Sequence, residues 1–186
     1  MTGAAAPRAS EHALVWSVKE SFLAYVNRTG GRITIVAPAY PGTDGFAFPH
    51  VPAAGRPGCS RMASGSGERA LHSGELAFTG GVVFRAHGGV LDVTLAEPVL
   101  VFDDQSALLT VVGTVRPGGG TRAVIAVLAD EPHVSTDEAV SFVPLLTDDG
   151  SALFGGVYPP GAAMDPLSVP HRLLATIPRA ISRLDG

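Results

Sequence analysis

The sequence predicts a mainly β protein: an antiparallel, sandwich-like sheet system with two short helices and a C-terminal helical tail. The first observation is that the 186 residues include 23 glycines and 15 prolines, which disfavour long helices and favour short strands joined by turns. The second is that residues 74–146 consist of short apolar runs separated by turn signals. The third is that these runs do not alternate with helical segments, as the strands of a parallel sheet would.

Composition excludes several function classes. A formal charge of −4 leaves no basic footprint, so no nucleic-acid partner is expected. A single cysteine, Cys59, excludes an internal disulfide framework and a cysteine-based metal cluster. No apolar run is long enough for a transmembrane segment, and the first residues lack the pattern of a signal peptide. A cytoplasmic protein is therefore expected, or an extracytoplasmic one if an export signal has been removed.

The first element expected after a flexible N-terminus (1–11) is a helix. Ser17 and Glu20 have the spacing of a capping box, in which both side chains bond free backbone amides at the helix start. Gly30 and Gly31 predict its end, and a β-branched strand is expected at residues 32–37. The apolar stripe of this helix comprises Val18, Phe22, Tyr25 and Val26.

Residues 38–73 are polar and rich in glycine and proline. A loop of this length usually covers a functional site or is disordered, although alternating Phe46 and Phe48 predict a short strand within it. Five strand-forming runs follow, ELAFTGGVVFRAHGG, VLDVTLAEPVLVF, SALLTVVGTV, TRAVIAVLA and AVSFVPLL.

The last third of the chain predicts two helices. Thr147 has the position of a cap for a short helix over DDGSALFGG. Residues 170–186 are expected to form an amphipathic helical extension, interrupted by Pro178, with arginines on its polar face. We expect this helix to pack on the domain, and a helix facing a partner or a membrane is the alternative. Its apolar stripe comprises Leu173, Leu174, Ile177, Ile181 and Leu184.

No catalytic motif is present. The glycines of GGVVFRAHGG precede no helix, so they do not form a dinucleotide-binding fingerprint. The six histidines show no spacing typical of a zinc site. We therefore assign no catalytic residues and do not expect an enzyme.

Three separated segments match one known family in order and spacing. They are LVWSVKESFLAYV at 14–26, GELAFTGGVVFRAHGGVLDVTLAEPVLVF at 74–102 and LLTDDGSALFGGVYPPGAAMDPLSV at 145–169. Together they resemble the Htaa domain, the haem transport-associated family of actinobacteria, over about residues 12–169. The resemblance implies a largely antiparallel β fold that holds haem at one end, and a role in passing haem along an uptake route.

The resemblance also implies the site residues. Tyr25 in SFLAY corresponds to the axial haem ligand, and His87 in FRAHGG corresponds to the histidine that hydrogen-bonds this tyrosine. Val157 replaces one ring of an aromatic pair that faces the haem, which departs from the family pattern. The resemblance further implies Ser21 and Tyr158 as pocket residues, and helical spacing adds Phe22, which we expect to face the same pocket.

The expected cofactor is ferric haem b. A free tyrosine has a pKa near ~10, so a phenolate at neutral pH needs stabilisation. A coordinated ferric ion supplies it, and a hydrogen bond from His87 would stabilise the anion further. Reduction or protonation would weaken this bond, which suits a carrier better than a catalyst.

The leading prediction is therefore a haem-binding protein for haem acquisition, trafficking or storage. One alternative is a cytosolic haem-dependent enzyme or sensor that uses the same pocket. Another is a β-sandwich interaction module that binds no haem and uses the arginine face of its C-terminal helix. Haem donor or acceptor proteins are the expected partners, and an apolar haem face leaves a homodimer open.

Overall fold

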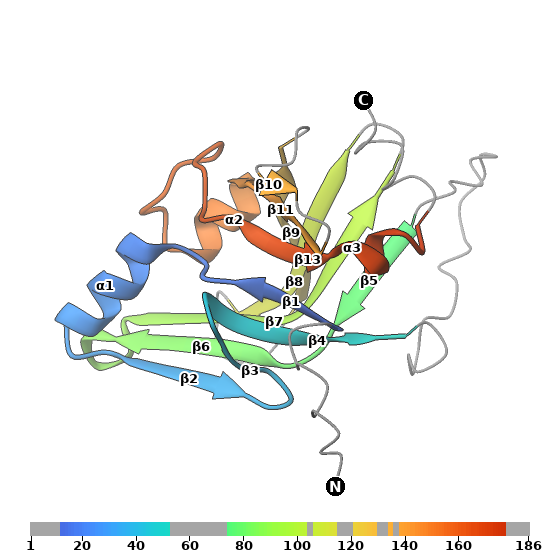
Figure 1. Cartoon of the computed structure of the whole chain (residues 1–186). Helices are drawn as coiled ribbons and strands as arrows, with labels where there is room; N and C mark the ends of the chain where they lie inside the picture. Colours follow the sequence, from blue (N-terminus) through green and yellow to red (C-terminus); the bar gives the residue numbers. More distant parts are fainter. Residues whose placement is uncertain are drawn as a thin grey trace, which may run out of the picture.

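The computed structural model describes residues 12–52, 74–103, 106–114, 121–129, 134–135 and 138–177. Within these ranges the helices are α1 (Glu20–Arg28), α2 (Asp148–Leu153) and α3 (His171–Leu174), with a 3-10 turn, η3, at His87–Gly89 (Figure 1). The strands are β1 (Ala13–Trp16), β2 (Arg32–Val36), β3 (Tyr40–Gly42), β4 (Gly45–Val51), β5 (Gly74–Phe78), β6 (Gly81–Ala86), β7 (Leu91–Phe102), β8 (Ala107–Thr114), β9 (Thr121–Leu128), β10 (Val134–Ser135), β11 (Ala139–Phe142), β12 (Pro144–Leu146) and β13 (Leu167–Pro170).

The strands form one connected sheet, and the pairs described are antiparallel, which confirms the predicted fold class. The hydrogen-bonded order is β10-β11-β13-β1-β4-β5-β7-β8-β9-β12. Strand β6 pairs with β7 and β2 pairs with β6, so these two strands extend the sheet beneath α1 (Figure 1). β3 pairs with β4.

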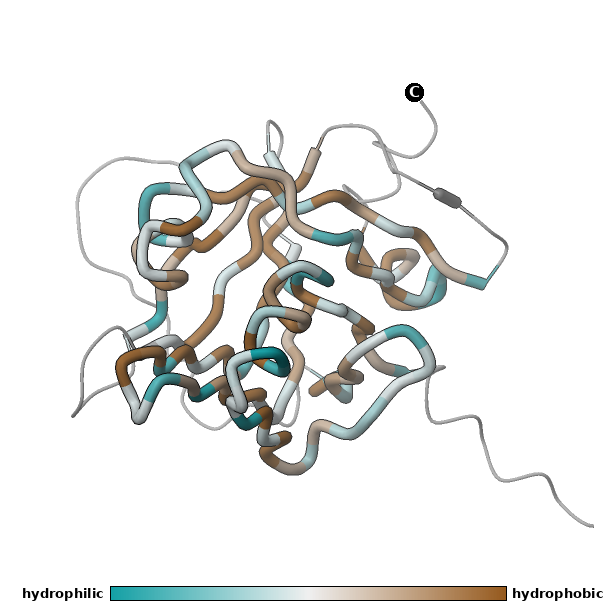
Figure 2. Tube along the Cα trace, turned by 90° about the vertical axis from the view of Figure 1, so that its left-hand side faces the viewer, coloured by the Kyte–Doolittle hydropathy of each residue, from teal (hydrophilic) through white to brown (hydrophobic). Residues whose placement is uncertain are grey.

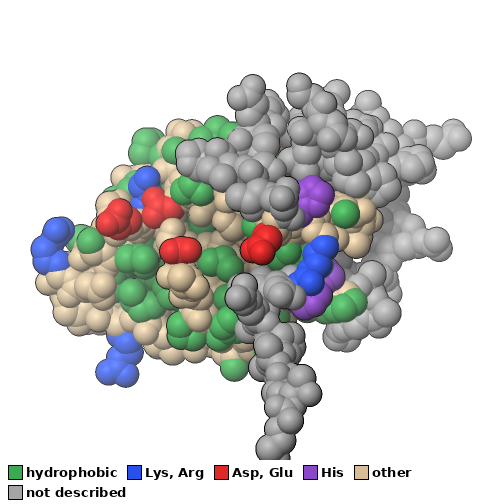
Figure 3. All heavy atoms as spheres, in the orientation of Figure 1, with side chains coloured by type: hydrophobic (Ala, Val, Ile, Leu, Met, Phe, Trp, Pro, Cys, Tyr) green, Lys and Arg blue, Asp and Glu red, His purple; other side chains and the backbone are tan. Residues whose placement is uncertain are grey.

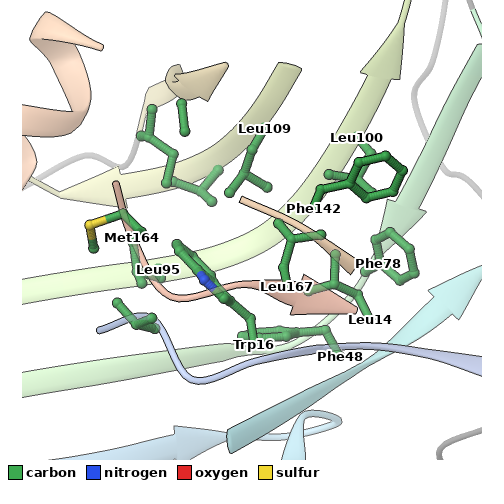
Figure 4. Close-up of a cluster of buried hydrophobic side chains, with 14 of the residues drawn as sticks. Leu14, Trp16, Phe48, Phe78, Leu95, Leu100, Leu109, Phe142, Met164 and Leu167 are labelled. Carbon is green, nitrogen blue, oxygen red and sulfur yellow. The ribbon is translucent and has the colours of Figure 1, made fainter. Parts of the chain in front are cut away.

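The sheet curves so that side chains of β1, β4 and β13 meet those of β7 and β8 in a single core (Figure 4). Trp16 is buried in this core, and its indole Nε1 donates a hydrogen bond to the backbone oxygen of Asp165 at 2.9 Å. This bond satisfies the polar atom that burial of the indole would otherwise leave without a partner. The core side chains labelled in Figure 4 are Leu14, Trp16, Phe48, Phe78, Leu95, Leu100, Leu109, Phe142, Met164 and Leu167.

Several sequence predictions are confirmed. The strand predicted after the first helix is β2, and the alternating Phe46 and Phe48 lie in β4 with both rings buried. Thr147 caps α2, because its side-chain oxygen accepts a hydrogen bond from the Gly150 amide at 3.1 Å.

The predicted capping box at the start of α1 is wrong. Lys19, not Ser17, precedes the first helical residue, and it makes no side-chain cap. The amide of Glu20 instead donates to the carboxylate of Asp165, and the hydroxyl of Ser17 donates to the same carboxylate oxygen. The capping group therefore comes from a distant loop.

The C-terminal extension packs on the domain as far as the structure describes it. Leu173, Leu174 and Ile177 are buried in and just after α3. The rest of the predicted tail (178–186), the N-terminal segment 1–11 and the segment 53–73, which includes Cys59, lie outside the described residues. Among the described helices, none has the length and apolar character needed to cross a bilayer.

Candidate functional site

Helix α1 is anchored to the sheet by one buried face. Phe22 is 3% exposed, and its ring meets Phe84 of β6 and Phe154 after α2 edge-on, at centroid distances of 5.1 and 5.3 Å. Val26, one turn later, is also buried. Because residues four apart share a helix face, these contacts fix the rotation of α1 about its axis. The neighbouring stripe, which contains Tyr25, is thereby presented at the surface.

The phenol of Tyr25 and the imidazole of His87 are in direct contact. The distance from the phenol oxygen to Nε2 is 2.7 Å, and the ring centroids are 5.7 Å apart. Tyr25 is half-buried and His87 is exposed, so solvent reaches the pair. The contact is compatible with two arrangements of the proton: a neutral phenol can donate to Nε2, or a protonated Nε2 can donate to a phenolate.

The backbone of η3 brings His87 to this position. His87 follows the last residue of β6 and has φ 51°, a left-handed conformation that histidine adopts more readily than most side chains. Gly88 continues the turn with φ 64°. The chain therefore reverses between β6 and β7 directly beside the last turn of α1.

A second hydrogen bond links α1 to the loop after α2. The hydroxyl groups of Ser21 and Tyr158 are 3.0 Å apart. The ring of Tyr158 also meets Phe154 edge-on at 6.1 Å. The structure thus brings together four of the residues predicted for the site, Tyr25 with His87 and Ser21 with Tyr158, on one side of α1.

Two of the predicted pocket residues have other environments. Phe22 lies in the core and supports α1 from behind. Val157, which precedes Tyr158, is not part of the core and is 69% exposed. Val90, directly after η3, is 89% exposed, so each of the two loops that contact α1 carries an exposed apolar side chain. Figure 2 views the molecule from this end.

The site contains few side chains that could bind a metal. Among the described residues no three His, Cys, Asp or Glu side chains form a group that could hold a bare metal ion. Tyr25 and His87 together offer one phenol oxygen and one imidazole nitrogen, 2.7 Å apart.

Sequence reasoning missed Asp165. It lies in the third segment of the family resemblance, in a proline-rich stretch that otherwise predicts only coil. In the structure its carboxylate bonds the amide of Glu20 and the hydroxyl of Ser17, and lies 3.7 Å from Nζ of Lys19. It therefore fixes the start of the helix that carries Tyr25.

Comparison with known proteins decides the family. The family model Htaa matches residues 11–170, which is most of the chain. The protein belongs to the Htaa family. A comparison of this Htaa-family protein with curated proteins finds no match.

Solved structures from Corynebacterium glutamicum share its fold. The N-terminal domain of HtaA is 26% identical, with a TM-score of 0.59, and the match covers 83% of this chain and 92% of that one. The C-terminal domain of HtaA is 24% identical, with a TM-score of 0.60, and the match covers 84% of this chain and 92% of that domain. The heme binding protein HtaB is 23% identical, with a TM-score of 0.62, and the match covers 85% of this chain and 90% of HtaB.

Proposed function

We propose that this Htaa-family protein binds ferric haem b as its cargo, for haem acquisition, trafficking or storage. In this proposal the phenolate oxygen of Tyr25 is the axial ligand and His87 is its hydrogen-bonding partner. The observation that carries the proposal is the 2.7 Å contact between these two side chains at a solvent-accessible end of the fold. Family membership supports the choice of haem, as does the fold shared with HtaB, which is a heme binding protein.

The chemistry of the pair suits a ferric ion. A phenolate is a hard anionic ligand and favours Fe(III), whose charge favours loss of the phenol proton. Nε2 of His87 lies where it can accept a hydrogen bond from the phenol, or donate one to the phenolate once Nε2 carries a proton. A partner that holds and orients an axial ligand in this way typically strengthens the binding of a metal centre.

The surroundings of the pair suit a flat apolar ligand. Val90 and Val157 expose aliphatic surface on the two loops that contact α1, and a porphyrin that covered this surface would gain roughly 25 cal/mol for each Å² removed from water. Ser21 and Tyr158 would line the same side, with Phe22 behind them. Val157 provides no ring to stack on the porphyrin, so we expect weaker stacking here than an aromatic pair would give.

A carrier role is favoured over catalysis. The bond between a phenolate and Fe(III) weakens when the iron is reduced or the oxygen is protonated, so the cargo can be released by a change of conditions. The same pocket leaves open the alternative of a haem-dependent enzyme or sensor, which predicts an open sixth coordination position that binds cyanide or reacts with peroxide.

Hemin titration of purified protein tests the proposal. We expect the wild type to bind hemin with the absorption spectrum of a tyrosinate-ligated ferric haem. Tyr25→Phe should lose that spectrum and weaken binding by more than about tenfold, because no phenol oxygen remains to coordinate the iron. Tyr40→Phe, which changes a half-buried tyrosine of β3, is the matched control. Wild-type affinity and spectrum in Tyr25→Phe would overturn the proposal.

A further inference from the structure

We propose that Arg28, at the end of α1, is a carboxylate-binding residue that holds a propionate of the porphyrin. This inference rests on the proposed function, because it names a second contact to the same cargo. Haem carries two propionates on one edge of its ring, and nothing in the Tyr25–His87 pair recognises a carboxylate.

Helical spacing puts Arg28 on the stripe that carries the proposed ligand. Ser21, Tyr25 and Arg28 are separated by four and three residues, the spacing of one helix face. Ala24 lies on the same face and is exposed, and its small side chain, which a helix tolerates well, occupies little of this face. Arg28 lies about 4.5 Å beyond Tyr25 along the helix axis, and its long side chain could reach a carboxylate of a ligand bound at the phenol of Tyr25.

Arg28 is available for a ligand. Its side chain is exposed in the last turn of α1, and it makes no hydrogen bond or ion pair to another described residue. Lys19, at the other end of the helix, is already engaged by the carboxylate of Asp165 at 3.7 Å and the backbone oxygen of Ala163 at 2.9 Å. Figure 3 shows basic side chains protruding at the edge of the molecule where α1 lies.

The nearby arginines of the sheet face away from this site. In β6, Phe84 and Ala86 are buried and Arg85 between them is exposed, so Arg85 points to the opposite face of the sheet from α1, which packs on Phe84. Arg32 lies directly across from Arg85 in the register and therefore shares its face. Arg85 is also paired with Asp92 at 3.2 Å.

The chemistry of a guanidinium fits this role. Its planar array of N–H donors matches the two oxygens of a carboxylate, and it stays charged at any physiological pH. With the iron held by Tyr25, a second contact at the porphyrin edge would fix the rotation of the ring about the iron–oxygen bond. The alternative is that Arg28 only stabilises the C-terminal end of α1 through the helix dipole.

Two ligands and two matched variants separate these possibilities. The ligands are hemin and hemin dimethyl ester, whose propionates are esterified and uncharged, and the variants are Arg28→Gln and Arg32→Gln. We expect Arg28→Gln to weaken hemin binding by about three- to tenfold, the range for a solvent-screened charge-assisted pair. The same variant should bind the dimethyl ester with the affinity of the wild type. Its loss of affinity for hemin should become smaller as salt is added.

The other outcomes would overturn either this inference or the proposed function. If Arg28→Gln weakens both ligands equally, the arginine supports the helix and the inference is overturned. If Arg28→Gln and Arg32→Gln bind hemin alike, the inference is also overturned, while a tyrosinate spectrum in both would leave the proposed function intact. If the wild type binds neither porphyrin, the proposed function itself has failed.

Discussion

The carboxylate of Asp165 accepts a hydrogen bond from the backbone amide of Glu20, with 2.6 Å between Oδ2 and N, although 145 residues separate the two in sequence. The amide of Asp165 in turn donates to the backbone oxygen of Val18 at 3.1 Å. An anion at this position satisfies a free amide and interacts favourably with the helix dipole. The loop before β13 thus holds the start of the helix that carries Tyr25.

Removing this carboxylate should destabilise the protein and loosen the site. We expect Asp165→Ala to lower the free energy of unfolding by about 1–2 kcal/mol, the typical cost of losing an N-terminal cap. Chemical denaturation checks the stability, and hemin titration checks whether α1 still presents Tyr25. Asp92→Asn is the control, because it removes an exposed carboxylate whose ion pair with Arg85 should contribute little. Equal stability of the two variants would contradict the role given to Asp165.

The capping error shows what local patterns cannot reveal. Ser17 and Glu20 have the right spacing, but a rule that considers only four consecutive residues cannot account for a competing carboxylate elsewhere in the chain. In the structure the Asp165 carboxylate takes both the Glu20 amide and the Ser17 hydroxyl. Val18, which the helical stripe included, precedes the helix with φ 70°. The Thr147 cap was predictable because the hydroxyl and the Gly150 amide that donates to it lie within one turn.

Strands were more predictable from sequence than the site. Alternation of apolar residues predicted the runs between 74 and 146, because each strand buries one face against the core. No spacing rule brings Tyr25 and His87 together across 62 residues, and that pairing was expected only from the family resemblance. η3 is the turn of the β6–β7 hairpin, and it lies beside α1 because β2, the strand that follows α1, pairs with β6 from a distant part of the sequence.

Replacing His87 should weaken haem binding without abolishing it. His87→Asn keeps a side chain that tolerates the left-handed backbone, with φ 51°, but is too short to reach the phenol oxygen of Tyr25. We expect hemin to dissociate about 10- to 100-fold faster, the usual effect of losing a partner that orients a metal ligand. Transfer of hemin to excess apomyoglobin measures the rate. His171→Asn, an exposed histidine on α3, is the control, and identical rates would argue against the contact.

Gly31 sets the distance between α1 and β6. A Cβ atom there would lie 2.6 Å from the backbone oxygen of Arg85 and 2.8 Å from Cγ1 of Val26. We expect Gly31→Ala to destabilise the protein by about 1–3 kcal/mol through overpacking, and to weaken hemin binding because the end of α1 must move away from His87. Gly30→Ala is the comparison, since its φ of 69° introduces backbone strain but its Cβ meets open space. Hemin binding that is weakened equally in both variants would exclude a specific steric effect.

Stability should also depend on pH through His50. Its half-buried ring in β4 packs edge-on against Phe78 at 5.8 Å, and burial lowers the pKa of His50, with a further contribution from the charge of His12. Because the unfolded chain then binds the proton more tightly than the folded one, the contribution of His50 to stability is complete above the ordinary histidine pKa of ~6.5. It is lost as the pH falls through that value toward the lowered pKa of the folded state.

Thermal unfolding at pH 7.5 and pH 5 measures this effect. We expect His50→Gln to reduce the drop in melting temperature between the two pH values by about 1–3 °C, a small change because solvent screens a half-exposed ring. His171→Gln, which replaces an exposed histidine of α3, is the matched control. If His50→Gln shows the same drop as the wild type, the acid sensitivity comes from other groups. In that case the contact of His50 with Phe78 has a purely structural role, because protonation of the His50 ring does not affect folding.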